Sequence, residues 1–256
     1  MMCAALALSL LAVPSFAEAA ATEETVAGES GDALGEDEMK EAVLAYLATC
    51  ILGTALEGQD AEEMMSMVLF INACVRNKSR TKRLADHLLS EMEDEVKELR
   101  LEEVSFPHVN ETFLRERDRL VGEKRFSSPI FDMARDFASA DVIVIAAPYW
   151  DLSFPAVLKQ YLEQINVVGI TFSYTEDGVP QGLCRATQLY YVTTAGGNYV
   201  PDEYGFGYVK ALAQGFYGIG KVECIKATGL DIIDADEDDI LERVMEFIGK
   251  KRDVRN

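Results

Sequence analysis

Short apolar runs alternate with amphipathic segments along most of the chain. Four runs rich in Val, Ile, Leu and Tyr are expected to form strands at Met67–Ala73, Val142–Ala147, Gln188–Thr194 and Val222–Ala227, and the more charged Val96–Val104 can form a fifth. Apolar runs of about four to eight residues are typical of strands buried on both faces, as in a parallel sheet.

Amphipathic segments separate these strands. Helices are expected at Lys82–Met92, Ala156–Asn166, Tyr204–Tyr217 and Ala235–Lys250, with mixed loop and helical segments at Phe106–Val121 and Pro129–Ala138. Thr171–Gly178 contains a Glu-Asp-Gly turn and predicts a short hairpin excursion. Strands that alternate with helices indicate an α/β fold with a doubly wound, five-stranded parallel sheet that has helices on both faces.

The first quarter of the chain differs in charge from the rest. Residues 1–66 hold 13 acidic residues and one basic residue, Lys40, and so contribute −12 to the net charge of −20. We expect an acidic leader over residues 1–64, largely disordered and with one possible helix at Glu38–Leu56, followed by a single domain over residues 65–256.

The leader has two interpretations. Met1–Ala21 is partly signal-like, because Ala4–Val13 is apolar and small residues follow at cleavage spacing, although no basic residue precedes them. Alternatively, Met65 or Met67 is the true start, which is favoured because Met67 opens directly onto a predicted strand. We expect a cytoplasmic protein without a membrane span, and the signal-like segment leaves export open.

Composition narrows the possible partners. A net charge of −20 repels a phosphate backbone and argues against nucleic acid as a partner. The cysteines are few and widely separated, which predicts neither a disulfide framework nor a zinc site; they are Cys3, Cys50, Cys74, Cys184 and Cys224. Together with only two histidines, this pattern predicts no metal site and favours a reducing compartment.

The loop after the first predicted strand has the character of an anion site. Ser79 and Thr81 offer hydroxyl groups there, and Arg76, Lys78 and Arg80 add positive charge. A polar loop that leads from a strand into a helix presents free backbone N–H groups and the positive end of the helix dipole to a phosphate. Ser79 or Thr81 could equally serve as an ordinary helix N-cap. Neither a Walker loop nor a GxGxxG fingerprint is present.

Two further loops carry candidate chemistry. Val142–Pro155, VIVIAAPYWDLSFP, continues from a strand into Tyr149 and Trp150, which offer a wall for a flat ligand or simply cap the core. Gly196 and Gly197 follow the strand that ends at Thr194. Paired glycines let a backbone approach a ligand closely, although they also occur in ordinary strand-to-helix turns.

These three loops become neighbours if the strands follow the flavodoxin-like order 2-1-3-4-5. In such a sheet, ligands bind beyond the carboxyl ends of the strands, at the point where the strand order reverses. One site would then combine an anion hole, a flat aromatic wall and a backbone open to close approach. That combination describes a pocket for flavin mononucleotide (FMN).

From about Met67 to Lys250 the chain resembles the flavodoxin-like NAD(P)H-dependent oxidoreductases, in particular the FMN-dependent NADH-azoreductase and quinone reductase family. The resemblance rests on PYWDLSFPAVLKQYLEQI, GITFSYTEDG and YYVTTAGGNY, in that order. It implies tightly bound FMN, NADH or NADPH as the electron donor, and hydride transfer through flavin N5 to quinones, azo compounds or related aromatics. It also implies a homodimer, to which Thr171–Gly178 is a candidate contributor.

The resemblance also assigns cofactor-binding roles by position. The phosphate and ribityl chain fall to Asn72, Ser79, Arg80 and Thr81; the isoalloxazine ring to Tyr149, Trp150, Asp151 and Leu152; and the pyrimidine side to Thr194, Ala195, Gly196 and Gly197. No catalytic acid or base is implied.

Two departures from the family pattern bear on substrate preference. The family's usual Tyr-Asn-Phe is Trp150-Asp151-Leu152 here, and its usual Arg in the glycine loop is Ala195. Two alternatives to an enzyme remain. One is a flavin-binding electron carrier or regulatory subunit without turnover, and the other is a dimeric interaction module with a vestigial pocket.

Overall fold

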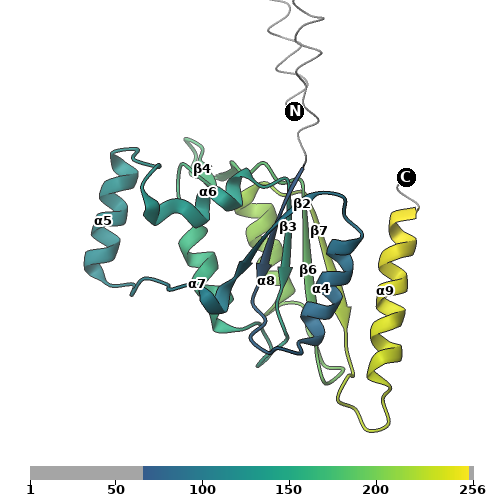
Figure 1. Cartoon of the computed structure of the whole chain (residues 1–256). Helices are drawn as coiled ribbons and strands as arrows, with labels where there is room; N and C mark the ends of the chain where they lie inside the picture. Colours follow the sequence, from purple (N-terminus) through teal and green to yellow (C-terminus); the bar gives the residue numbers. More distant parts are fainter. Residues whose placement is uncertain (1–65, 254–256) are drawn as a thin grey trace, which may run out of the picture. The chain divides into compact units, whose positions relative to one another are not determined.

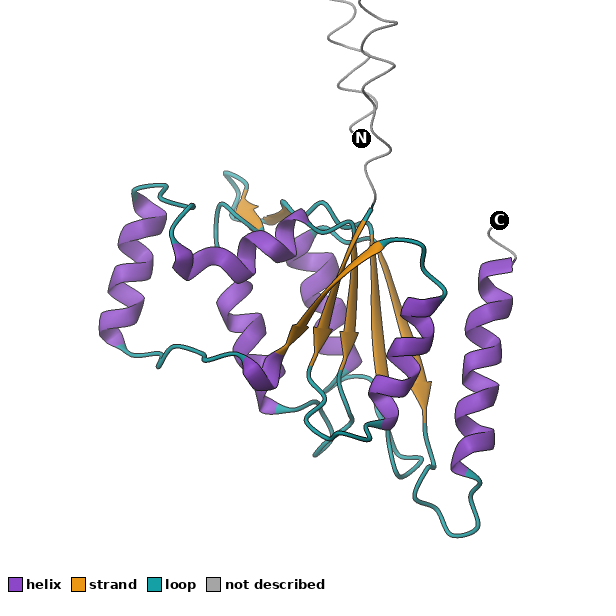
Figure 2. Cartoon of the chain, in the orientation of Figure 1, coloured by secondary structure: helices purple, strands orange, loops and turns teal. Residues whose placement is uncertain are grey.

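The computed structural model describes residues 66–253, and their centre is one parallel sheet (Figures 1 and 2). The strand order is β2-β1-β3-β6-β7. Its strands are β1 (Met67–Asn72), β2 (Glu95–Arg100), β3 (Val142–Ala146), β6 (Gln188–Thr194) and β7 (Lys221–Ala227). Counted along the chain, these five strands give the order 2-1-3-4-5, so the flavodoxin-like topology predicted from the sequence is confirmed.

Both faces of the sheet are buried, as the apolar runs predicted. Along β1, Leu69 and Ile71 point into one hydrophobic cluster, whereas Val68 and Phe70 point into another. The first face is covered by α6 (Asp132–Ser139), α7 (Ala156–Ile165), α8 (Phe206–Leu212) and the π-helical turn η3 (Ala213–Tyr217). The second is covered by α4 (Arg80–Ser90) and α9 (Glu237–Asp253), which lie together in Figure 1.

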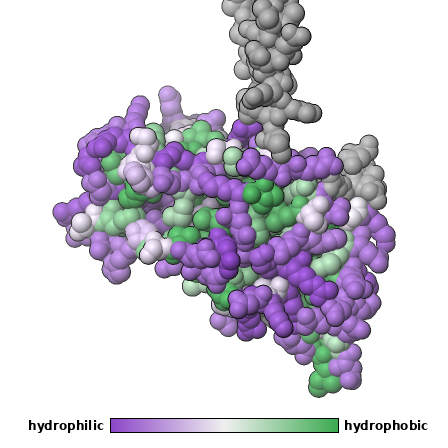
Figure 3. Space-filling model, viewed as in Figure 1, coloured by the Kyte–Doolittle hydropathy of each residue, from purple (hydrophilic) through white to green (hydrophobic). Residues whose placement is uncertain are grey.

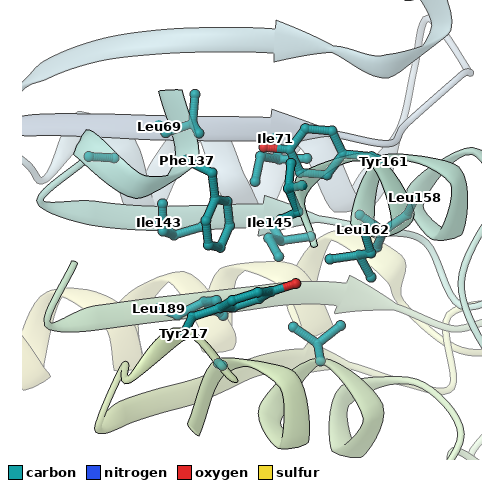
Figure 4. Packing of buried hydrophobic residues seen from close by; sticks show 14 of the residues in the cluster. Leu69, Ile71, Phe137, Ile143, Ile145, Leu158, Tyr161, Leu162, Leu189 and Tyr217 are labelled. Carbon is teal, nitrogen blue, oxygen red and sulfur yellow. The ribbon is translucent and has the colours of Figure 1, made fainter. Parts of the chain in front are cut away.

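Aromatic side chains fill the first cluster between the sheet and its helices (Figure 4). Phe137 from α6 meets Tyr217 edge to face at a ring-centroid distance of 4.8 Å, and both belong to the cluster that includes Ile143 of β3. Each fully buried side chain of this size contributes about 1.5–3 kcal/mol relative to an exposed one. The rigid sheet that results holds the loops at its carboxyl edge in place.

Helix α5 (Glu111–Gly122) is more exposed and lies at the left of Figure 1. Asn110 caps it by accepting a hydrogen bond from Phe113 N at 2.9 Å, and Leu120 is its buried residue. Charged pairs such as Arg119–Glu123 follow its outer side. Hydrophilic residues of this kind dominate the face seen in Figure 3, as expected for a solvated surface.

Two predicted elements differ from the structure. The second strand was expected to run from Val96 to Val104, but β2 ends at Arg100, and Leu101–Glu103 forms a 3-10 turn (η1) that buries Leu101. β2 is an edge strand without a buried residue, so its pattern carried little information about its end. A second 3-10 turn, η2 (Pro129–Phe131), leads into α6.

The helix expected at Tyr204–Tyr217 begins only at Phe206, and its second half is the π-helical η3. Gly218 ends this segment with a φ of 78°, a left-handed conformation that glycine adopts at little cost. The boundaries of these elements therefore differ from the predicted ones, whereas their order along the chain is as predicted.

The predicted hairpin is present as an antiparallel pair outside the main sheet. β4 (Phe172–Tyr174) pairs with β5 (Pro180–Gly182), which lies beyond the predicted range of 171–178. Phe172 packs edge to face on Phe216 of η3 with ring centroids 4.8 Å apart. Thr171 anchors the base of the hairpin by donating a hydrogen bond to Ile165 O at 2.7 Å.

The expected leader, with its signal-like segment, possible helix and candidate start at Met65, lies outside the described residues. Within residues 66–253, no helix combines the length and apolarity that crossing a bilayer requires. The same part of the chain contains no cluster of three or more His, Cys, Asp or Glu side chains placed to hold a metal ion.

Candidate functional site

A cavity of about 220 Å³ lies at the carboxyl edge of the sheet, where the loops follow the arrowheads in Figure 2. Four loops contribute its lining residues, which are Val75, Arg76, Lys78, Ser79, Arg80, Thr81, Pro148, Tyr149, Trp150, Thr194, Gly196 and Asp231. Seven of the twelve predicted site residues are among them. The three loops singled out from the sequence thus meet at one place.

The first loop places the start of α4 at the cavity. Ser79 is the N-cap of this 11-residue helix, and its hydroxyl accepts a hydrogen bond from Lys82 N at 3.3 Å. That bond is long enough to be exchanged for one to a ligand. The first turn of α4 contains no acidic residue, so its positive dipole end is not offset there.

Thr81 joins the first loop to the third. Its hydroxyl lies 2.6 Å from that of Thr194 at the end of β6, and both residues are buried. Asn72, by contrast, does not line the cavity. Its amide nitrogen donates to Glu98 Oε1 at 2.8 Å, and its oxygen accepts from Cys74 N at 2.9 Å. Asn72 therefore shapes the loop.

The aromatic loop is fixed by backbone bonds. Tyr149 N donates to Thr194 O at 3.0 Å, and Trp150 and Ser153 exchange two backbone hydrogen bonds of 3.0 and 2.8 Å. Between them, Asp151 and Leu152 have φ values of 51° and 69°, as in a type I′ turn. Asp151 and Leu152 do not line the cavity, whereas Trp150, 37% exposed, stands at its rim.

Tyr149 contains a polar atom that the surrounding protein does not satisfy. Its hydroxyl is buried and has no hydrogen-bond partner among the described residues. Burial raises the pKa of this hydroxyl, so it stays protonated at neutral pH. A buried hydroxyl without a partner is costly. Tyr149 lines this cavity and also a second, smaller one that Thr193 and Lys226 line, and the Lys226 ammonium lies near enough to act on its hydroxyl.

The glycine loop is shaped by a residue that the sequence analysis did not select. A Cβ atom on Gly196 would overlap the Asp231 carboxylate, which would have to move away to admit it. Gly197 and Ala195 do not line the cavity. Ala195 is buried and donates its N–H to Ala227 O at 2.9 Å, which turns it toward the sheet.

Asp231 belongs to the loop between β7 and α9, which backs the glycine loop. Three backbone bonds join them: Gly229 N to Gly197 O at 3.1 Å, Leu230 N to Ala195 O at 3.3 Å, and Asp231 N to Gly196 O at 2.9 Å. The signal that could have found Asp231 was topological. Because β7 lies beside β6 and runs parallel to it, the loop that follows β7 lies at the same carboxyl edge of the sheet as the glycine loop.

Basic side chains give this cavity a local charge opposite to that of the chain. Arg76, Lys78 and Arg80 line it, with Asp231 as the one acidic lining residue. Arg80 donates to Asp231 Oδ1 at 2.6 Å and to Glu237 Oε2 at 3.2 Å. The guanidinium lowers the pKa of the Asp231 carboxyl, so this carboxylate is ionised at neutral pH.

These residues fit FMN. A helix N-terminus, hydroxyl groups and three cations form the donor set that a phosphate prefers. Trp150 supplies a flat apolar surface, and Gly196 allows close approach of the backbone.

Comparisons with known proteins agree with the fold and with this chemistry. Residues 66–249 match the family model described as flavodoxin-like fold. The chain is 37% identical over 195 residues to an FMN-dependent NADH:quinone oxidoreductase of Clostridium perfringens strain SM101; the match covers 73% of this chain and 96% of that relative.

Solved structures show the same likeness. The crystal structure of an azoreductase from Bacillus anthracis strain Sterne superposes with a TM-score of 0.63 at 25% identity, covering 73% of this chain and 98% of that one. An FMN-dependent NADH-azoreductase from B. anthracis strain Ames Ancestor, solved in complex with FMN, gives a TM-score of 0.60 at 23% identity and 73% and 97% coverage. At that identity the second match supports the fold alone.

Proposed function

The chain belongs to the flavodoxin-like family that includes the FMN-dependent NADH:quinone oxidoreductases, and from this membership we propose that it is itself an FMN-dependent NAD(P)H oxidoreductase. The observation that carries the proposal is the meeting of the loops after β1, β3 and β6 around one cavity. An anion-binding loop, an exposed aromatic side chain and a glycine are found together at that edge. This combination favours a working cofactor site over one that has been lost.

Different residues of the cavity would hold different parts of FMN. Ser79, Thr81 and the start of α4 would hold the phosphate, with Arg80 and Lys78 supplying charge. Trp150 would cover one end of the flat ring at the rim. The other five predicted residues do not line the cavity, so in this proposal they shape the loops and do not contact FMN directly. They are Asn72, Asp151, Leu152, Ala195 and Gly197.

When bound, the flavin supplies the chemistry, because it accepts and returns a hydride. The protein orients the partners and keeps the ring accessible on the solvent side, where Trp150 is 37% exposed. Donor and acceptor must approach to about 3–3.5 Å for transfer. We assign no side chain as an obligatory acid or base.

We further propose quinones or azo compounds as oxidants, with NADH as the donor, in line with the names of the relatives. We also propose a cytoplasmic homodimer. Exposed apolar side chains on and beside the hairpin support a covered surface there, with Tyr174 at 51%, Val179 at 57% and Leu183 at 45% exposure. Light scattering coupled to size-exclusion chromatography would measure twice the chain mass.

A steady-state assay tests the activity. Purified protein supplied with FMN should oxidise NADH when menadione is present, with repeated turnover. Slow reduction by NADH without turnover would instead favour the electron carrier. Purified protein that is colourless, and that does not oxidise NADH or NADPH with menadione after FMN is added, would refute the proposal and favour the vestigial pocket.

A further inference from the structure

We propose that Asp231 determines how strongly this site prefers a phosphorylated flavin, by competing with the cofactor phosphate for Arg80. The inference rests on the proposed function, because it concerns the same cavity. It assigns a role to the loop between β7 and α9, in which the family resemblance named no site residue.

The competition follows from the geometry of the ion pair. Asp231 accepts from both terminal nitrogens of Arg80, at 2.6 Å from Nη1 and 3.4 Å from Nη2. This is the paired edge of the guanidinium that also suits a phosphate. Glu237 contacts Nη1 as well, at 3.2 Å. A phosphate at the start of α4 would therefore have to displace or share these contacts.

The carboxylate is also held where it can influence a ligand. Asp231 N donates to Gly196 O at 2.9 Å, and the carboxylate lies over the Gly196 α-carbon. Its side chain is 64% exposed, whereas that of Arg80 is 24% exposed. The acid therefore faces the cavity from a backbone that is fixed to the glycine loop.

Arg80 is the basic lining residue whose charge is already compensated. In the part of the chain that the structure describes, Arg76 and Lys78 have no ion-pair partner, while Arg80 has two. The Asp231 carboxylate also repels a phosphate dianion that approaches this end of α4. Removing that one charge would leave Arg80 with the longer Glu237 contact alone, which frees Nη2 for a phosphate, and it would also relieve the repulsion. The binding of a flavin without phosphate would be insensitive to either effect.

The test compares Asp231→Asn with Asp234→Asn. Both variants remove one negative charge from the same loop, and Asp234 lies outside the cavity lining. Its φ of 66° is a conformation that asparagine adopts readily. Bound flavin is first removed by dialysis against concentrated KBr. The dissociation constants of FMN and riboflavin are then measured at low salt from the quenching of flavin fluorescence.

Asp231→Asn should bind FMN about five- to tenfold more tightly than the wild type, with the gain shrinking as salt is added. Its affinity for riboflavin should stay within about twofold, as should the FMN affinity of Asp234→Asn. A structural role would move both flavins together. Circular dichroism confirms that each variant is folded, and Asp231→Ser repeats the test if the asparagine variant is not.

Weaker FMN binding by Asp231→Asn, or an equal shift for FMN and riboflavin, would overturn the inference. An affinity equal to that of Asp234→Asn would do the same. These results are distinct from failure of the proposed function, in which the wild type itself would bind neither flavin.

Discussion

A hydrogen bond between two buried hydroxyl groups joins helix α4, whose start lines the cavity, to the end of strand β6. Thr81 and Thr194 are 1% and 7% exposed, and their oxygens lie 2.6 Å apart. Thr81→Val should lower the free energy of unfolding by about 1–3 kcal/mol, because it leaves the Thr194 hydroxyl buried without this partner. Urea denaturation followed by circular dichroism measures the change.

The double variant Thr81→Val/Thr194→Val serves as the control. Replacing both hydroxyls with methyl groups removes the unsatisfied atom, so the double variant should be more stable than Thr81→Val alone. Strict additivity of the two single changes would show that the hydroxyls do not depend on each other.

At this scale, sequence reasoning predicted which loops meet at the cavity more reliably than which side chains line it. Ser79 and Trp150 line the cavity as predicted, because both project from loop positions at strand ends. Leu152 does not; it has a left-handed φ of 69° and is 45% exposed. Asp231 was missed because its acidic surroundings resemble a solvated loop, and only the fold brings it onto Gly196.

Among the elements, the hairpin makes one especially close backbone contact with the π-helical turn. A Cβ on Gly182 of β5 would fall on the backbone of Tyr217 and Gly218, which cannot move aside as a side chain can. Gly182→Ala should therefore destabilise the protein by about 2 kcal/mol or more. The midpoint of urea unfolding gives the difference.

Gly220→Ala provides the matched comparison for that change. No atom lies within 4 Å of the Cβ that it would add, and Gly220 has no positive φ. It should be neutral or stabilising by up to about 1 kcal/mol, because alanine restricts the unfolded chain. Equal losses in the two variants would indicate that the contact between β5 and η3 is unimportant.

The elements also show why part of the fold was predictable. Strands such as β3 are buried on both faces, and a short, continuous apolar run between polar segments fits that position far better than it fits a half-exposed strand or a surface helix. The limits of β2 and the extent of β5 were missed because an edge strand and a three-residue strand have little burial pattern of their own. Contacts distant in sequence set their ends.

For the molecule as a whole, one buried thiol (Cys74) and two partly buried ones (Cys184 and Cys224) set a limit on alkaline stability. Burial raises the pKa of Cys74 to about 11 and those of Cys184 and Cys224 to about 12. Unfolded thiols release their protons near pH 8.5–9, roughly. Between these values the native state holds more protons than the unfolded state, so the free energy of unfolding should fall as pH rises.

Urea unfolding at a series of pH values from about 8 to about 11 checks this expectation. Each linked thiol should remove up to about 1.4 kcal/mol per pH unit within its window. Cys184→Ala should show a shallower decline than the wild type below about pH 10, where tyrosines add little. A stability that is constant over this range would contradict the burial of the thiols.

The central claim for the whole molecule is that an acidic chain folds to gather a basic, aromatic and glycine-bearing rim at one edge of its sheet. Trp150, the chain's only tryptophan, stands at that rim and reports on what binds there. Titration of flavin-free protein with FMN, followed by tryptophan fluorescence, is the most direct test. We predict strong quenching that saturates at one FMN per chain, and fluorescence that does not respond to FMN would contradict the account.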